Sequence, residues 1–183
     1  ALLASSREGE EAIWLHVLKQ KQALALMHQA QAAINSEAST AAAADAKTTT
    51  TTTTAAAFDP LAVQWLIVPR HPQRFDEVAA LLSRAGLRVS RRSQWHAEPP
   101  TEPSATEVDV WLGDSLGEMA LYYALADVAL LGGSFEPLGG QNLIEAAACG
   151  CPVVLGPHTF HFAPAAAAAC SVGAALGSNS CKR

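Results

Sequence analysis

The sequence is poor in basic charge and has no long apolar run, and each shortage excludes a class of protein. Twelve Lys and Arg residues stand against seventeen Asp and Glu, a net charge of −5, so no basic face for nucleic acid is expected. No apolar run approaches the ~20 residues of a membrane-spanning helix, and Ala1–Ala4 is too short and uncharged for a signal peptide. We therefore expect an intracellular protein that does not bind nucleic acid.

CxxC pairs and the common nucleotide-binding motifs are also missing. The four cysteines form no CxxC pair, and His158 and His161 do not complete a zinc-ligand pattern, so we expect no metal site. Cys149 and Cys151 are more typical of small buried residues. The patterns GxxxxGK[ST] and GxGxxG are absent, which removes the main support for classical kinase and dinucleotide-binding functions.

Apolar segments and helical patterns alternate along most of the chain. The near-continuous run Val63–Val68 predicts a strand covered on both faces. Arg74–Arg84 follows with apolar residues at helical spacing, and Gly86 closes that helix. Further strands are predicted at 87–90, 108–112, 128–131 and 152–155, and helices at about 116–125 and 142–149. This alternation predicts an α/β fold, a Rossmann-like parallel sheet with helices on both faces.

The amino-terminal third differs in composition from the rest. Ala1–Ser6 is typical of the end of a buried strand, and Glu11–Ile34 consists almost entirely of good helix formers. Residues 35–57 lose all periodicity and include Thr48–Thr54, which predicts disorder, although the Thr tract alone also fits an edge strand. The predicted organisation is a domain of residues 1–34 and 58–176, a disordered insertion at 35–57 and an irregular tail at 177–183.

Ligands of such sheets bind beyond the carboxyl ends of the strands, so the loops there carry the candidate residues. In the proline-rich turn that begins at Pro69, Arg70 can present a planar fork to phosphate or carboxylate, or it can be an ordinary surface arginine. In the loop after Leu112, helix capping accounts for Asp114 and Ser115 and is the favoured interpretation there. Gly117 and Glu118 then remain as candidates for close approach to a ligand.

Two glycine pairs bracket the loop after Leu131. The second pair, Gly139-Gly140, opens onto a predicted helix whose free N–H groups and positive dipole end favour a phosphate. Glu145 lies in that helix, where it can accept hydrogen bonds from sugar hydroxyls or simply compensate the dipole. His158 and His161, after the next strand, can contact an anion, transfer a proton or only close the loop.

Taken together, the segments 68–75, 113–118, 126–135, 139–146 and 156–160 resemble the 3-deoxy-D-manno-octulosonic acid (Kdo) transferases in order and spacing, and 4–11 resembles the start of the family's second domain. Gln141 departs from the family, which commonly has His there. The resemblance implies the carboxy-terminal, donor-binding half of a GT-B glycosyltransferase, truncated at both ends. The substrate-binding residues it implies, with the loops above, are Arg70, His71, Gly117, Glu118, Gly133, Ser134, Gly139, Gly140, Gln141, Asn142 and Glu145.

The resemblance also implies a function for the complete enzyme. That enzyme would transfer Kdo from CMP-Kdo to a lipid A precursor in the lipopolysaccharide biosynthesis of Gram-negative bacteria, at the cytoplasmic face of the inner membrane. No cofactor is expected, and the catalytic base and the membrane contact would belong to an amino-terminal domain absent from this chain. Two alternatives remain open: a non-catalytic nucleotide-binding fragment, and another GT-B transferase that uses a UDP-sugar.

Overall fold

The fold is seen in a computed structural model that describes residues 1–42, 63–95 and 108–177. The chain forms two units: one contains residues 1–15 and 64–183, and the other residues 16–63. Residues 43–57 of the predicted insertion and 178–183 of the predicted tail lie outside the described residues. The candidate site lies entirely in the first unit.

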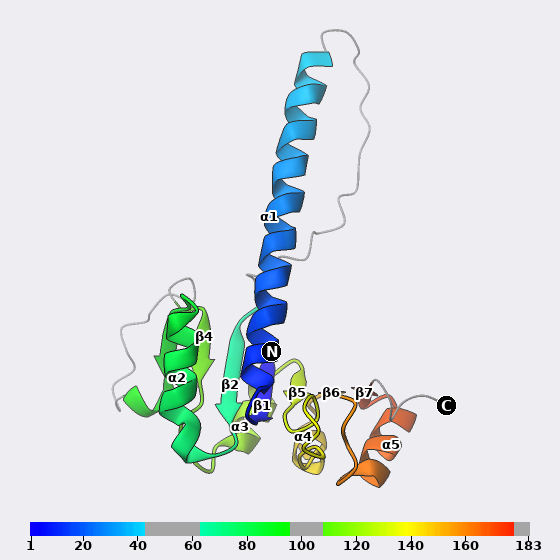
Figure 1. The fold of residues 1–183 in the computed structure, drawn as a ribbon. Helices are drawn as coiled ribbons and strands as arrows, with labels where there is room; N and C mark the ends of the chain where they lie inside the picture. The colour runs from blue at the N-terminus through cyan, green and yellow to red at the C-terminus, as the bar shows by residue number, and fades with distance from the viewer. Residues whose placement is uncertain (43–62, 96–107, 178–183) are drawn as a thin grey trace. The chain divides into compact units, whose positions relative to one another are not determined.

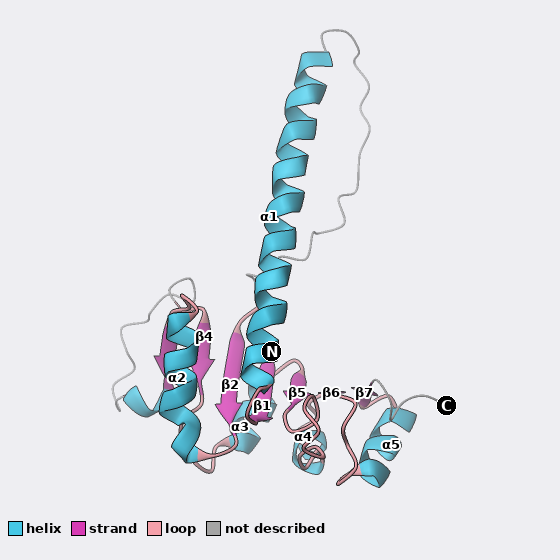
Figure 2. Cartoon of the chain, in the orientation of Figure 1, coloured by secondary structure: helices cyan, strands magenta, loops and turns pink. Residues whose placement is uncertain are grey.

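Seven strands of the described residues form one sheet, and every neighbouring pair is parallel (Figure 1, Figure 2). In sheet order they are β3 (Val89–Arg91), β4 (Val110–Leu112), β2 (Trp65–Pro69), β1 (Leu2–Ser6), β5 (Ala129–Leu131), β6 (Val153–Leu155) and β7 (Ala175–Gly177). The helices between them are α1 (Glu10–Ala42), α2 (Phe75–Arg84), α3 (Met119–Leu125), α4 (Ile144–Ala148) and α5 (Ala163–Ser171), with 3₁₀ turns at Pro72–Arg74 and Arg92–Gln94. The predicted α/β class with a parallel sheet is confirmed.

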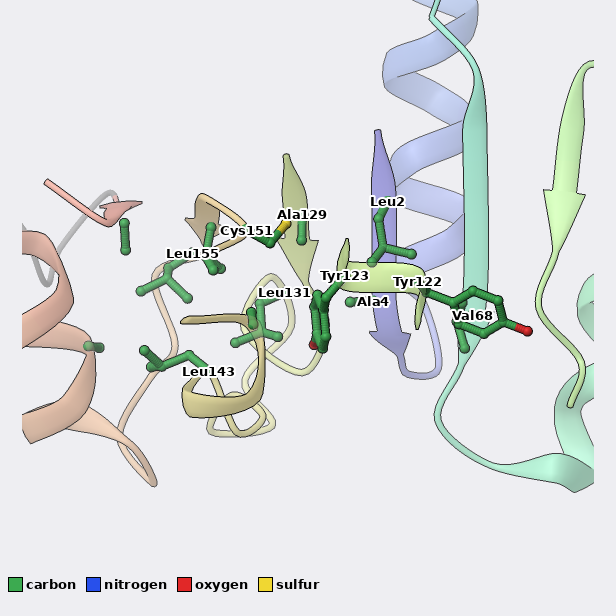
Figure 3. Close-up of a cluster of buried hydrophobic side chains, with 14 residues drawn as sticks. Leu2, Ala4, Val68, Tyr122, Tyr123, Ala129, Leu131, Leu143, Cys151 and Leu155 are labelled. Atoms are coloured by element: carbon green, nitrogen blue, oxygen red, sulfur yellow. The ribbon is translucent and has the colours of Figure 1, made fainter. Parts of the chain in front are cut away.

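The central strand β1 is buried on both faces because its side chains alternate between two layers of helices. Leu2 and Ala4 of β1 point into a core cluster that also contains Tyr123 of α3, Ala146 of α4 and Ala166 of α5 (Figure 3). Leu3 and Ile67 are equally buried but lie outside that cluster, on the opposite face. There Trp14 of α1 packs edge-on against Trp65, with ring centroids 5.3 Å apart. The strands therefore have fixed positions on both sides, and so do the loops at their ends.

Two predicted element boundaries differ from the structure, each for a physical reason. Helix α1 continues to Ala42 instead of ending at Ile34, because neither glycine nor proline occurs between Gly9 and Pro60 to stop it. After residue 162 no element is predicted, yet α5 and β7 form, and Gly177 ends β7 instead of opening the irregular tail. Helix α5 consists mostly of alanine, and its packing uses methyl groups. Its sequence therefore shows no apolar periodicity.

The order of the strands places a switch point beside β1. From β1 the chain moves to β2 on one side, and after β4 it crosses back to β5 on the other side of β1. Sheets of this kind bind ligands in the crevice outside the carboxyl ends of the strands at such a point. The loops after β1, β2 and β5 are therefore the structural setting of the candidate site.

Candidate functional site

The loops after β1 and β5 meet at the switch point with their backbones in contact. The N–H of Gly132 donates to the Ala4 carbonyl at 2.8 Å. A Cβ on Gly132 would lie 2.3 Å from the Ser5 carbonyl oxygen, so only glycine permits this approach. Ser5 itself has a φ of 54°, and it is the one non-glycine residue in the described ranges with a positive φ. Such strain persists where surrounding structure holds it, and it concentrates at functional sites.

Glu10 ties these two loops together. Its side chain is 2% exposed and accepts hydrogen bonds from three backbone N–H groups: Arg7 at 2.8 Å, Gly133 at 2.8 Å and Phe135 at 3.1 Å. Because this carboxylate also lies in the first turn of α1, the helix dipole favours its charge. A single side chain thus fixes the backbone on both sides of the crevice.

Glu11 fixes the loop after β2 in the same way. Its carboxylate, 1% exposed, forms a two-pronged ion pair with Arg74, at 2.9 Å and 3.0 Å, and accepts the Ser6 hydroxyl at 2.6 Å. Arg74 is 5% exposed and also lies 3.5 Å from Glu77 and 3.7 Å from Glu8. The loop that carries Arg70 and His71 is therefore anchored at its far end.

Sequence reasoning missed these anchoring residues. The sequence alone suggests ordinary, solvated helix-terminal charges for Glu10, Glu11 and Arg74, because charged residues are usually exposed. The available signal was position: two acids directly follow a buried strand and a short glycine turn, where a parallel sheet brings loops together.

Arg70 and Glu145 come from different elements, and both affect the pKa of one buried phenol, that of Tyr123. Arg70, beyond β2, and Glu145, in α4, are both exposed. Burial raises the pKa of Tyr123, the negative charge of Glu145 raises it further, and the positive charge of Arg70 lowers it. Tyr123 is 2% exposed and belongs to the cluster drawn in Figure 3. Both predicted residues thus lie near enough to Tyr123 to affect its pKa, and no ion pair within the described ranges holds either charge.

The glycine loop after β5 differs from the predicted anion site. Helix α4 begins at Ile144, not at Asn142, and has five residues, so Gly139-Gly140 does not open directly onto it. The Gly140 N–H donates to the Gly133 carbonyl at 2.6 Å, and the Asn142 side chain accepts the Ile144 N–H at 3.0 Å. The Gly140 amide, which the sequence predicts to hold phosphate, is thus bonded within the loop in this structure.

Two neighbours complete this loop. The His161 ring lies against Gly139, where a Cβ would come within 1.9 Å of the ring, and the Gln141 amide lies against Gly133. The Ser134 hydroxyl, fully buried, donates to the Leu131 carbonyl and accepts the Gly156 N–H at 2.9 Å. Because its proton is used within the fold, Ser134 links the loops after β5 and β6.

The loop after β4 is also organised differently from the capping prediction. Asp114 caps no helix; it accepts the Ser93 N–H at 2.7 Å and the Arg91 guanidinium at 2.7 Å, and so fixes the turn after β3.

Glu118 accepts hydrogen bonds from Ser115, from the Tyr122 hydroxyl at 2.8 Å and from Arg92 at 2.8 Å. These bonds, that of Ser115 foremost, lower the pKa of Glu118. Gly117 is exposed with a φ of 80°.

Asp114 should make stability sensitive to acid. Burial opposes its ionisation, but hydrogen bonds from Ser93 and Arg91 outweigh it and lower its pKa. A depressed carboxylate stabilises the fold above its unfolded pKa of about 3.9, and that contribution disappears as the pH falls through the folded pKa. We expect Asp114→Asn to lower the urea midpoint at pH 7 and to flatten its decline between about pH 4 and pH 2. Asp127→Asn, at an exposed position, is the control, and parallel curves for Asp114→Asn and wild type would refute this role.

The chain is similar to known Kdo transferases. It is 47% identical over 174 residues to the 3-deoxy-D-manno-octulosonic acid transferase of Bordetella pertussis, covering 95% of this chain and 32% of that protein. It is 45% identical over 97 residues to the enzyme of the same name from Haemophilus influenzae, covering 53% and 21%. No protein-family model matches the chain.

A solved structure is similar as well. The C-terminal CMP-Kdo binding domain of WaaA from Acinetobacter baumannii superposes with a TM-score of 0.53 at 34% identity, covering 64% of this chain and 58% of that one. These similarities confirm the predicted resemblance to Kdo transferases and to their donor-binding half. The chain spans only 32% and 21% of the two curated relatives.

Two further observations concern metals and membranes. In the described ranges, no three His, Cys, Asp or Glu side chains are grouped so that they could hold a metal ion. None of the helices described combines the length and hydropathy needed to cross a bilayer.

Proposed function

We propose that this chain is the donor-binding domain of a Kdo transferase and binds CMP-Kdo at the carboxyl edge of its sheet. The observation that carries the proposal is that Arg70, directly after β2, and Glu145, in the first turn of α4, are both exposed and both lie near enough to the buried Tyr123 to affect its pKa. The similarity to the CMP-Kdo binding domain of WaaA supports this choice of ligand.

Each group has a chemical role in this proposal. The Arg70 fork binds the donor's anionic groups, and the Glu145 carboxylate accepts hydrogen bonds from the ribose hydroxyls. His71, Gly133, Gly139 and the amides of Gln141 and Asn142 line the phosphate, while Gly117 and Glu118 border the nucleotide. Positive charge placed where the phosphate leaves stabilises the departing CMP, so the proposal needs no metal or cofactor.

The proposal extends to the whole protein. In a GT-B enzyme of two facing domains, the hydroxyl of a lipid A precursor attacks the anomeric carbon of Kdo, and CMP leaves. The catalytic base and the membrane contact belong to the other domain, at the cytoplasmic face of the inner membrane. The relatives' names and their greater length support this assignment.

Arg70→Ala and Glu145→Ala should each weaken CMP binding. Because each loses a charge-assisted hydrogen bond, worth about 1.5–3 kcal/mol, we expect the Kd for CMP to rise roughly 10- to 100-fold. Calorimetric titration of the purified chain measures the effect. Arg84→Ala and Asp127→Ala remove exposed charges of the same sign elsewhere and should leave the Kd unchanged.

The same titrations decide between the alternatives. Equal affinity of wild type and both site variants for CMP would defeat the assignment of the site. Thermal shift with UDP exceeding that with CMP would favour a UDP-sugar transferase, since the ligand that stabilises more at equal concentration binds more tightly. Binding of CMP without Kdo transfer by a complete protein containing this domain would favour the non-catalytic alternative.

A further inference from the structure

We propose that Arg7 is a further contact for the donor phosphate, placed at the switch point by the loop after β1. This inference rests on the proposed function and deepens it, because it adds a residue that the resemblance does not supply. The glycine loop has few free hydrogen-bond donors. With the Gly140 N–H and the Ser134 hydroxyl both bonded within the fold, the glycine loop alone offers the phosphate few partners.

Position is the first argument for Arg7. Its loop follows β1, the strand beside the switch point, and the backbone N–H groups of Arg7 and Gly133 bond to the same oxygen of Glu10, each at 2.8 Å. The backbones of Arg7 and Gly133 therefore lie close together beside the switch point. The strained Ser5 and the backbone contact at Gly132 hold the loops after β1 and β5 close together.

The second argument is that the charge of Arg7 has a weak partner. Its one ion pair among the described residues is with Glu8 at 3.6 Å, and the Glu8 side chain is 63% exposed. The buried Nε of Arg7 has no hydrogen-bond partner, although its side chain as a whole is 28% exposed. The nearby Glu10 carboxylate is already engaged by three N–H groups.

Arg74 differs from Arg7 in its carboxylate partner and not in its Nε, which is also buried without a hydrogen-bond partner. The Arg74 side chain is 6% exposed, and its guanidinium donates two hydrogen bonds to the buried Glu11 carboxylate. Arg7, one loop away, keeps a half-buried planar fork with a single exposed counter-ion. A phosphate matches that fork in shape and charge, because guanidinium binds phosphate through two parallel hydrogen bonds.

The test compares CMP with cytidine, which lacks the phosphate, by calorimetric titration of the full 183-residue chain. We expect Arg7→Gln to raise the Kd for CMP about tenfold or more and to leave the Kd for cytidine unchanged. Arg7→Met keeps the apolar stem that packs in the fold and should give the same result, so the test survives if one variant is unstable. Arg84→Gln is the matched control, an exposed arginine in the last turn of α2.

The outcomes separate this inference from the proposed function. If wild type binds CMP and both Arg7 variants bind it equally well, the role of Arg7 is refuted and the proposed function stands. If both variants lose CMP and cytidine by the same factor, Arg7 only supports the fold and the inference is again refuted. If wild type binds neither CMP nor CMP-Kdo, the proposed function fails and the inference fails with it.

Discussion

Replacing either partner of the Glu11–Arg74 ion pair with Met is expected to lower the free energy of unfolding by about 3–5 kcal/mol. The pair is buried on both sides, with side-chain exposures of 1% and 6% and contacts of 2.9 Å and 3.0 Å. Removing one member leaves the other in a buried position without its main counter-charge. Arg74→Met should be the more severe change, because Glu11 then keeps only the Ser6 hydroxyl, whereas Arg74 retains Glu8 and Glu77.

Urea unfolding of both single variants and of the double variant measures this effect. The double variant should recover part of the loss, because two unbranched apolar chains of similar size can occupy the space without any buried charge. Arg88→Met serves as the control: its pair with Asp109 is 57% and 34% exposed, so the expected loss is about 1 kcal/mol or less. Losses equal to that of Arg88→Met would show that the buried pair does not hold the loop.

The pair also matters for the donor site. Arg74 ends the loop that begins after β2, and Arg70 lies within it. If Glu11 and Arg74 act as the anchor, the double variant should bind CMP less tightly than wild type even where its stability is largely restored, because two Met side chains cannot fix the direction of the loop. The double variant would then have largely restored stability but weaker CMP binding.

The sheet was predictable because buried strands have nearly continuous apolar sequences. Val63–Val68 is apolar except for Gln64, Val128–Leu131 is apolar throughout, and Gly86, with a φ of 87°, ends α2 where the sequence places the cap. The end of α1 and the whole of α5 were not predictable in this way. Alanine is compatible with helix and with coil, so Ala-rich stretches give no periodicity to interpret.

The location of the candidate site was predictable, but the hydrogen bonds within it were not. Parallel-sheet topology alone directs attention to the loops that carry Arg70 and Glu145. It does not reveal that Asp114 bonds to Ser93 instead of capping a helix, or that Glu10 reaches two loops distant in sequence. Such contacts depend on which loops the strand order makes neighbours, and the order β2-β1-β5 becomes visible only in three dimensions.

Gly132→Ala is expected to destabilise the fold and to disrupt donor binding together. The new Cβ would lie 2.3 Å from the Ser5 carbonyl oxygen and 2.8 Å from that of Ala4, both backbone atoms of the central strand and its end. Backbone cannot move aside as a flexible side chain can, so we expect a loss of about 3 kcal/mol, the upper part of the range for overpacked cores. The loops after β1 and β5 must then separate, and the hydrogen bond from Gly132 to Ala4 lengthens.

Gly150→Ala is the matched control because it isolates the other cost of replacing a glycine. Gly150 has a φ of 69° and open space around its Cα, so alanine there meets only the left-handed strain of about 1–2 kcal/mol. Both variants lose stability, yet only Gly132→Ala changes the crevice between β1 and β5. We therefore expect the Kd for CMP, measured well below both melting temperatures, to rise at least tenfold in Gly132→Ala and to stay at the wild-type value in Gly150→Ala. Equal affinity in the two variants would mean that the donor does not bind at the switch point.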